Sequence, residues 1–288
     1  IELSVAGQDV VSFELQKISA FDIESKTVVF AQNAREQSFL NEHALSDILS
    51  TLKTRGQQYP AVGRLMENGT VEILDGSRRR MSCILAKQDF LVYVAKDINT
   101  EHAKFLSDVA NAHKPLSLFE KGKEMQIKLD TGEAADQKAL AQMFQCSEAL
   151  VSGALKAASL PLELLQAYPS VAELGRPTIV KLHKQFFTLS ESMQQELVNR
   201  CKEQTVSTWT ALDGHGVTRM TKHISEQIES WIAELSPQRI ERAGPVKQEL
   251  IKGRVSYSRK GANLTLNLKK LDDRKMARLF EFLEKELI

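Results

Sequence analysis

The sequence predicts a mainly α-helical protein of several domains: a small mixed α/β domain, an all-helical middle region and a C-terminal ββα unit. Three observations support this. A chain of 288 residues is long for one domain. Residues 1–97 mix strand-like alternation with helical spacing, whereas from residue 98 the spacing is helical with few strand signals. A charged segment with Pro and Gly then reads as a linker. We therefore expect domains at 1–97, 98–235 and 253–288, with a linker at 236–252.

The composition limits the class of protein. Hydrophobic residues make up 42% of the chain, which supports packed cores. Three scattered cysteines fit a reducing compartment and neither a disulfide framework nor a zinc site. No run approaches about 18 apolar residues and no secretory signal is visible, so we expect a cytoplasmic protein that does not cross a membrane. Because the chain starts at Ile1, we expect that the true N-terminus has been trimmed.

Charge is distributed unevenly along the chain. The net charge of +1 argues weakly against nucleic-acid binding. However, residues 1–50 carry eight acidic side chains against three basic ones, whereas residues 238–260 carry seven basic against two acidic. This asymmetry predicts local contact with a polyanion.

Residues 1–97 read as short strands and helices in alternation. Residues 1–30 predict strands in a hairpin, and Ala44–Leu52 predicts a helix with one apolar face. An Asn-Gly turn at residues 68–69 predicts a second hairpin. The further strands expected are Ala61–Arg64, Val71–Leu74 and Phe90–Val94.

The most informative stretch is residues 74–80, with the sequence LDGSRRR. A strand-like run stops at an Asp-Gly turn, and a helix with three arginines follows. Glycine allows close approach of the backbone to a ligand, and a helix N-terminus presents free N–H groups to an anion. Arginine adds bidentate contacts to phosphate. The pattern favours a polyphosphate site on a strand–turn–helix, while a solvated basic helix start is the alternative.

The middle region contains a helix-turn-helix candidate. Its helices are Asp136–Phe144 and Ser147–Ala158, and Gln145 occupies the turn position where glycine is usual. A two-helix hairpin in a purely structural bundle is the alternative interpretation. The further helices expected are Pro161–Leu165, Thr178–Phe187, Glu191–Cys201 and Val217–Glu234.

The C-terminal unit reads as two strands and a helix. The strands are Arg254–Ser258 and Leu264–Leu268, and Asp272-Asp273 opens the helix. So short a unit cannot bury an apolar stripe alone, and a symmetric partner would cover it. The alternative is packing onto the rest of the chain. The dimerisation stripe consists of Met276, Leu279, Phe280, Leu283 and Leu287.

Three segments, followed by the helix-turn-helix, resemble the ParB partition family. They are Arg55–Arg64 (RGQQYPAVGR), Leu74–Arg80 and Asp108–Gly122, and the first two are similar to segments of the plasmid-type branch. Asn33–Gln37 resembles an N-terminal patch of that branch. The resemblance implies an N-terminal domain that binds CTP with Mg²⁺. The residues assigned to the nucleotide are Gly56, Gln57, Pro60, Ala61, Gly76, Ser77, Arg78, Arg79 and Asn111.

The chain departs from chromosomal members of that family at the metal position. Their Glu-Asn pair is replaced by Ala110-Asn111, which leaves Asn111 as the metal-ligand candidate and leaves CTP hydrolysis open. Glu120 is one candidate general base, but a solvated helix carboxylate is the preferred interpretation. The strand–turn–arginine pattern also resembles sulfiredoxin. That enzyme needs a turn cysteine where Ser77 stands, and Cys83 reads as a core residue, so the reductase interpretation is poor.

The DNA-reading candidates are few, because the second helix of the motif carries only two charged residues. Its candidates are Ser147, Glu148, Ser152 and Lys156. Arg176, between Gly175 and Pro177, is expected on a loop from which it reaches a base, although a non-reading role is equally compatible. For Lys181 and Lys184, the alternative to DNA contact is a position on a solvated helix face. Phosphate contacts are expected from Arg254, Arg259 and Lys260.

The resemblance implies a nucleoid-associated bacterial protein that binds a palindromic centromere site on double-stranded DNA as a homodimer. CTP would close a clamp that slides along DNA, and a Walker-type ParA ATPase would bind a segment preceding Ile1. One alternative is a nucleotide-independent helix-turn-helix transcriptional repressor. Another is a stand-alone enzyme of the sulfiredoxin-like kind.

Overall fold

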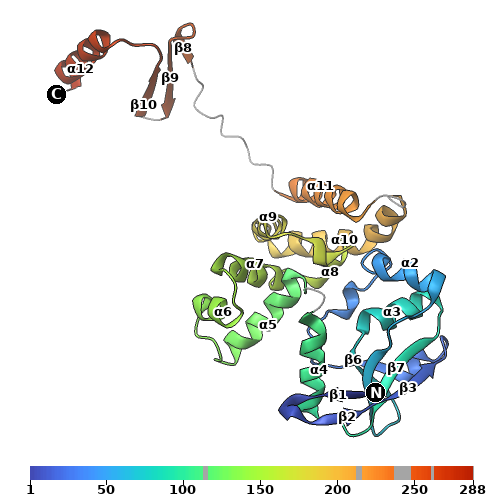
Figure 1. The fold of residues 1–288 in the computed structure, drawn as a ribbon. Coiled ribbons are helices and arrows are strands. Elements are labelled where there is room, and N and C mark those ends of the chain that lie inside the picture. Colours follow the sequence, from blue (N-terminus) through green and yellow to red (C-terminus); the bar gives the residue numbers. More distant parts are fainter. Residues whose placement is uncertain (113–115, 212–215, 237–247, 261–262, 288) are drawn as a thin grey trace. The chain divides into compact units, whose positions relative to one another are not determined.

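The computed structural model describes residues 1–112, 116–211, 216–236, 248–260 and 263–287. The chain divides into two compact units, Ile1–Ser236 and Pro237–Ile288, and each is described by itself (Figure 1). Within the described residues, no helix combines the length and apolarity needed to cross a membrane. Helices predominate, and one larger mixed sheet lies in the N-terminal part.

The N-terminal part is built on a five-stranded mixed sheet with strand order β3-β7-β5-β6-β4. The pairs β4–β6 and β5–β7 are parallel, while β3–β7 and β5–β6 are antiparallel. Ile73, Phe90 and Val92 are fully buried, which explains the apolar alternation in these strands. The strands are β3 (Glu14–Ile18), β4 (Thr27–Val29), β5 (Ala61–Leu65), β6 (Val71–Asp75) and β7 (Phe90–Ala95).

Both predicted hairpins are confirmed. β1 (Glu2–Ser4) pairs antiparallel with β2 (Val10–Ser12). The hairpin of β5 and β6 turns at Asn68 and Gly69, where Gly69 has φ +82° and the Asn68 side chain accepts a hydrogen bond from the Thr70 N–H. The Asn-Gly signal thus specified this turn.

Short helices connect the strands of this part. Helix α4 packs against β6, and its Ala103 lies in one buried cluster with Phe30, Leu74 and Ile98. Helix α4, which follows residue 98, therefore covers part of the N-terminal sheet. The domain boundary expected between residues 97 and 98 stays a prediction. The helices are η1 (Ala6–Gln8), α1 (Ile23–Lys26), η2 (Gln37–Phe39), α2 (Ser46–Arg55), α3 (Ser77–Ala86) and α4 (Thr100–Ala112).

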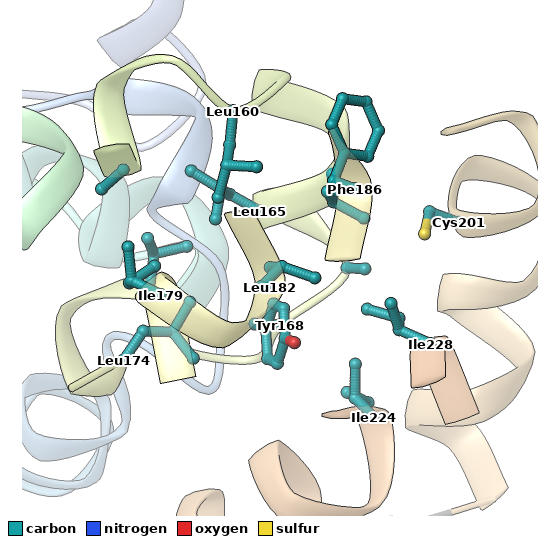
Figure 2. Close-up of a cluster of buried hydrophobic side chains, with 14 of the residues drawn as sticks. Leu160, Leu165, Tyr168, Leu174, Ile179, Leu182, Phe186, Cys201, Ile224 and Ile228 are labelled. Carbon is teal, nitrogen blue, oxygen red and sulfur yellow. The ribbon is translucent and has the colours of Figure 1, made fainter. Parts of the chain in front are cut away.

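The middle region is all helical, as the sequence predicted. Its core gathers buried side chains from α7 to α11, among them Leu165, Tyr168, Ile179, Leu182 and Ile228 (Figure 2). The helices are α5 (Leu118–Asp130), α6 (Gln137–Met143), α7 (Glu148–Ala158), α8 (Leu162–Gln166), η3 (Val171–Glu173), α9 (Arg176–Phe186), α10 (Glu191–Ala211) and α11 (Val217–Leu235).

Helix α10 runs beyond the predicted end at Cys201. The Trp209 indole N–H donates to the Ala167 carbonyl (3.0 Å), and its ring meets that of His43 edge to face with centroids 5.3 Å apart. Tertiary contacts therefore support the last turns, which lack a clear apolar periodicity of their own.

The C-terminal unit has three strands rather than the predicted two. The extra strand β8 (Gln248–Ile251) falls within the segment predicted as linker, and it pairs antiparallel with β9 (Val255–Lys260). Strand β10 (Asn263–Leu268) pairs with the other edge of β9, and α12 (Asp273–Leu287) follows. The sequence did not predict this strand, because the surrounding segment is charged and because pairing with β9 is a tertiary contact. The unit is therefore βββα.

The predicted apolar stripe lies along α12. Met276 and Phe280 are 41% and 57% exposed, and Leu279 and Leu283 are half-buried. The side chain of Leu287 lies outside the described residues. Within its own unit, the stripe is thus only partly covered.

Candidate functional site

A cavity of about 440 Å³ lies where the strand–turn–helix of residues 74–80 meets helix α2 and the loop that follows it. The walls come from four segments far apart in the sequence. The lining residues are Asn33, Arg35, Asp47, Ile48, Thr51, Leu52, Gly56, Gln57, Gln58, Tyr59, Leu74, Asp75, Gly76, Ser77, Arg78, Arg79 and Ala110.

Gly76 makes the turn between β6 and α3 possible. Its φ is +101°, and a Cβ atom there would lie 2.7 Å from the Ala61 Cβ and 3.1 Å from the Arg79 Nε. No side chain caps the N-terminus of α3, and the first helical hydrogen bond runs from the Arg80 N–H to the Gly76 carbonyl. The backbone N–H groups of Ser77 and Arg78 therefore begin a helix of ten residues at the cavity wall, where an anion is favoured.

Arg78 reaches from α3 to α2. Its Nη2 donates to the Asp47 Oδ1 at 2.7 Å and to the Ala44 carbonyl at 3.2 Å. The Arg78 side chain is 15% exposed and that of Asp47 is 50% exposed. The guanidinium predicted to neutralise phosphate is thus held by a carboxylate that lines the same cavity.

Arg79 is anchored more heavily than its neighbour. It donates to the carbonyls of Tyr59 (3.2 Å) and Pro60 (3.0 Å), and its Nη2 lies 2.7 Å from the Asp75 Oδ2. These contacts fix the loop after α2 against the end of β6. Arg79 lines the cavity and at the same time holds its wall.

The third arginine serves the fold. Arg80 donates to the Thr27 Oγ1 (2.6 Å) and the Thr27 carbonyl (3.1 Å), and it is not among the residues that line the cavity. Burial lowers its pKa, which a nearby Glu24 partly offsets. The run of three arginines therefore divides into two cavity residues and one structural residue.

The predicted base- and sugar-lining residues divide in the same way. Gly56 and Gln57 line the cavity, but the Gln57 side chain donates to the Tyr59 and Leu91 carbonyls and accepts from the Leu91 N–H. Pro60 and Ala61 lie behind the wall. Sequence reasoning missed Tyr59, an aromatic residue that lines the cavity and is 78% exposed.

A buried charged junction connects this cavity to the helical region. Arg35 is 8% exposed and lines the cavity wall. Burial lowers its pKa, the Glu120 carboxylate raises it, and Arg78 lowers it further. Glu120 accepts hydrogen bonds from the Glu36 N–H (2.8 Å) and the Ser117 N–H (2.6 Å).

The interpretation of Glu120 as a solvated helix carboxylate is wrong. Glu120 is 4% exposed and completes a capping box with Ser117 at the start of α5. A carboxylate that already accepts from two backbone N–H groups and the Ser117 hydroxyl is suited to holding α5 in place.

Asn111 is the metal-ligand candidate, and its side chain lies outside the described residues. Among those residues, no group of three or more His, Cys, Asp or Glu could hold a metal ion. Cys83 is fully buried, and burial together with Asp89 raises the pKa of its thiol to about 12, against a lowering by Arg79. Such a thiol is a poor nucleophile, which agrees with its interpretation as a core residue.

Two helices, α6 and α7, joined by a short turn occupy the predicted helix-turn-helix segment. Gln145, at the turn position where glycine is usual, has φ +48°, a left-handed conformation that favours glycine. Helix α5 supports the pair from beneath: a Cβ atom on Gly122 would lie only 2.0 Å from the Ala154 carbonyl oxygen. Gly122 is therefore what allows α5 and α7 to cross so closely.

The exposed start of α7 carries the predicted reading residues. Ser147 is the N-cap and accepts from the Leu150 N–H (3.2 Å), and Glu148 is exposed beside it. Ser152 and Lys156 are half-buried. The hydroxyl of Ser147 is partly committed to the helix cap, which leaves a sparse set of polar groups on this helix.

Arg176 is the first residue of α9 and does not lie on a loop as predicted. Gly175 is the N-cap, and Pro177 suits the first turn, where no intrahelical N–H partner is needed. The Arg176 Cγ would lie 2.8 Å from a Cβ atom on Gly153 of α7. The exposed arginine therefore rests on the recognition-helix candidate, a contact that only tertiary packing reveals.

The other basic candidates have different surroundings. Lys181 forms an ion pair with Glu229 at 2.6 Å, whereas Lys184 is exposed. Arg254 and Arg259 are exposed in the C-terminal unit, and the Lys260 side chain lies outside the described residues. The pairing of Lys181 favours its interpretation as part of a helix face.

Comparison with known proteins gives several sequence relatives. The chain is 32% identical over 199 residues to Protein SopB of Escherichia coli O157:H7, covering 69% of this chain and 61% of SopB. It is 38% identical over 155 residues to a Plasmid Partition par B protein of Escherichia coli, covering 53% and 44%. The chain is a relative of the plasmid-type ParB partition proteins. This confirms the resemblance found in the sequence, while no family model matches the chain.

The chain spans less than two thirds of the length of these ParB-type relatives. It is also 35% identical over 176 residues to the virulence regulon transcriptional activator VirB of Shigella flexneri, covering 60% of this chain and 56% of VirB.

Two solved ParB structures align with the chain at low TM-scores. A Caulobacter crescentus ParB complexed with CTP-gamma-S is 14% identical, covers 67% of this chain and 98% of its own, and has a TM-score of 0.30. A ParB–DNA complex with a double B-box interaction is 20% identical, covers 59% and 91%, and has a TM-score of 0.37. Superposition at these TM-scores places no residue of this chain.

Proposed function

We propose that this protein is a bacterial DNA partition protein that binds a palindromic centromere site as a homodimer and uses CTP to close a clamp around DNA. The observation that carries the proposal is one compact unit with two features. It holds an arginine-lined cavity at the N-terminus of α3, and it holds helices α6 and α7 in the predicted helix-turn-helix segment. Helix α5, which packs on α7, accepts a hydrogen bond at Glu120 from the Glu36 N–H, next to the cavity residue Arg35. The relationship to SopB and the plasmid ParB protein supports the partition role.

The cavity fits a nucleoside triphosphate. Its volume of about 440 Å³ lies within the range of small-ligand sites, which is roughly 300–1,000 Å³. The N–H groups at the start of α3 and the guanidinium of Arg78 would hold the phosphates, and the ring of Tyr59 would stack on the base. A bound nucleotide would add negative charge at the cavity wall, to which Arg35 also contributes. Asn111 is the proposed contact to Mg²⁺, and we assign no hydrolytic residue.

The helix-turn-helix fits a DNA groove. Ser147 and Glu148 at the exposed start of α7 would meet base edges. Arg176, at the start of α9, would join them, because its side chain packs against Gly153 of α7. Lys184, Arg254, Arg259 and Lys260 would contact phosphates. Because α7 itself is poor in charge, sequence discrimination depends on Arg176 more than on any lysine.

Dimerisation is assigned to the C-terminal βββα unit. The α12 stripe is only partly covered within the unit, and a second copy related by a two-fold axis would cover it. A two-fold dimer matches a palindromic DNA site. A ParA-type ATPase partner and association with the nucleoid in the cytoplasm belong to the same proposal.

The second candidate function is nucleotide-independent control of transcription. The similarity to VirB, which is named a transcriptional activator, favours this class. The contacts of Arg79 and Arg80 would then be structural only.

The experiment that separates the two candidates begins with selection of bound sequences from a random duplex library. The selected site, closed into a circular or end-blocked DNA, is then used to measure salt-resistant retention with CTP, with ATP and without nucleotide. Retention that requires CTP supports the clamp. Retention that is the same in all three conditions supports the nucleotide-independent regulator and contradicts our proposal.

A further inference from the structure

The ion pair between Arg78 and Asp47 places a carboxylate where the proposed function needs a phosphate. Both residues line the cavity, and the Arg78 Nη2 lies 2.7 Å from the Asp47 Oδ1. The other described acceptor of Arg78 is the Ala44 carbonyl at 3.2 Å. Asp47 is thus the single charged acceptor among the described contacts of this guanidinium.

The two cavity arginines of α3 differ in how easily they change partner. Arg79 is tied to two backbone carbonyls and to Asp75, and losing those contacts would release the loop after α2. A change of partner at Arg78 breaks its contacts with one carboxylate and one carbonyl. The released Asp47 side chain, which is 50% exposed, can then be hydrated by solvent. The exchange of a carboxylate for a phosphate is therefore available at Arg78 without dismantling the wall.

We propose that Asp47 is an affinity-setting residue: it pairs with Arg78 when no nucleotide is bound and must release it before the phosphates of the nucleotide are bound. This inference rests on the proposed nucleotide function. The carboxylate competes directly for the guanidinium, and after release its negative charge remains beside the phosphates and disfavours them. Asp47 thereby raises the nucleotide concentration at which the cavity fills.

The test is calorimetric titration of CTP into the full chain and four variants: Asp47→Asn, Arg78→Ala, the double variant, and Asp22→Asn. Asp22 is the matched control, because it is another partly exposed carboxylate of the N-terminal part in an ion pair, with Lys26 at 2.8 Å, and it does not line the cavity. Inorganic triphosphate and cytidine serve as separate probes of the phosphate and nucleoside parts. Thermal melts check that each variant is folded.

We expect Asp47→Asn to tighten CTP and triphosphate binding about threefold or more, as for release of a partly exposed ion pair. The gain should largely vanish in the Arg78→Ala background, and cytidine binding and the Asp22→Asn control should be unchanged. Unchanged or weaker CTP binding by Asp47→Asn, an equal gain in both backgrounds, or a gain with cytidine would overturn the inference while leaving the nucleotide site intact. If CTP binds neither the wild type nor any variant, the proposed function itself fails and the inference fails with it.

Discussion

Replacement of Gly122 by Ala tests whether α5 positions the recognition helix α7. A Cβ atom at this position would lie 2.0 Å from the Ala154 carbonyl oxygen and 2.5 Å from the carbonyl carbon. Both are backbone atoms, so no side chain can turn away. Relief to an ordinary van der Waals contact of 3.4 Å or more moves the helices apart by about 1.4 Å, and it loosens a cluster in which Met125 and Val151 are buried. Overpacking of this kind costs about 1–3 kcal/mol and occasionally more.

The assay compares Gly122→Ala with Gly216→Ala by urea unfolding and by affinity for the selected DNA site. Gly216 has φ −66° and no heavy atom within 4 Å of a Cβ built there, so it is the matched control. We expect Gly122→Ala to lower the free energy of unfolding by the amount above and to weaken DNA binding. CTP affinity should change little, because residue 122 does not line the cavity. Wild-type stability and DNA affinity in Gly122→Ala would refute the reasoning.

Four further results follow from described contacts. A disulfide reagent at pH 8 should label Cys146, which is partly exposed, and spare the two other thiols until denaturant is added, because burial raises their pKa values to about 12; labelling of all three in the native protein would contradict this. Glu120→Gln should lower the free energy of unfolding by about 1–3 kcal/mol in urea, since it removes a charged acceptor of the buried Ser117 N–H and the partly buried Glu36 N–H. Arg79→Ala should weaken CTP binding by about 2 kcal/mol in calorimetry, and equal affinity would count against the site. Leu279→Asp in the full chain should give a monomer in sedimentation, whereas an unchanged dimer would move the interface elsewhere.

The local elements of this protein were predictable because their signals are local. The Asn68-Gly69 hairpin and the turn at Gly76 each follow from the preferences of a few adjacent residues. Strand β8 was missed, because four residues within a longer charged stretch become a strand only through their pairing with β9. The position of Arg176 at the start of α9 was missed because a following Pro was interpreted as a break instead of a first-turn residue.

The partners of the site residues could not be predicted. Asp47 meets Arg78 across 31 positions of the sequence, and Glu120 meets Glu36 across 84. Nothing in the local pattern distinguishes such a carboxylate from a solvated one, and for Glu120 the solvated interpretation was wrong. Sequence therefore identified which segments form the cavity, while the structure was needed to show which of their side chains are already engaged.

Calorimetric titration of CTP, ATP and GTP into the full chain tests the central claim most directly. The account predicts one saturable CTP site per chain, far weaker binding of ATP and GTP, and loss of CTP affinity in Arg78→Ala. Absence of CTP binding, or equal affinity for the three nucleotides, would contradict the account.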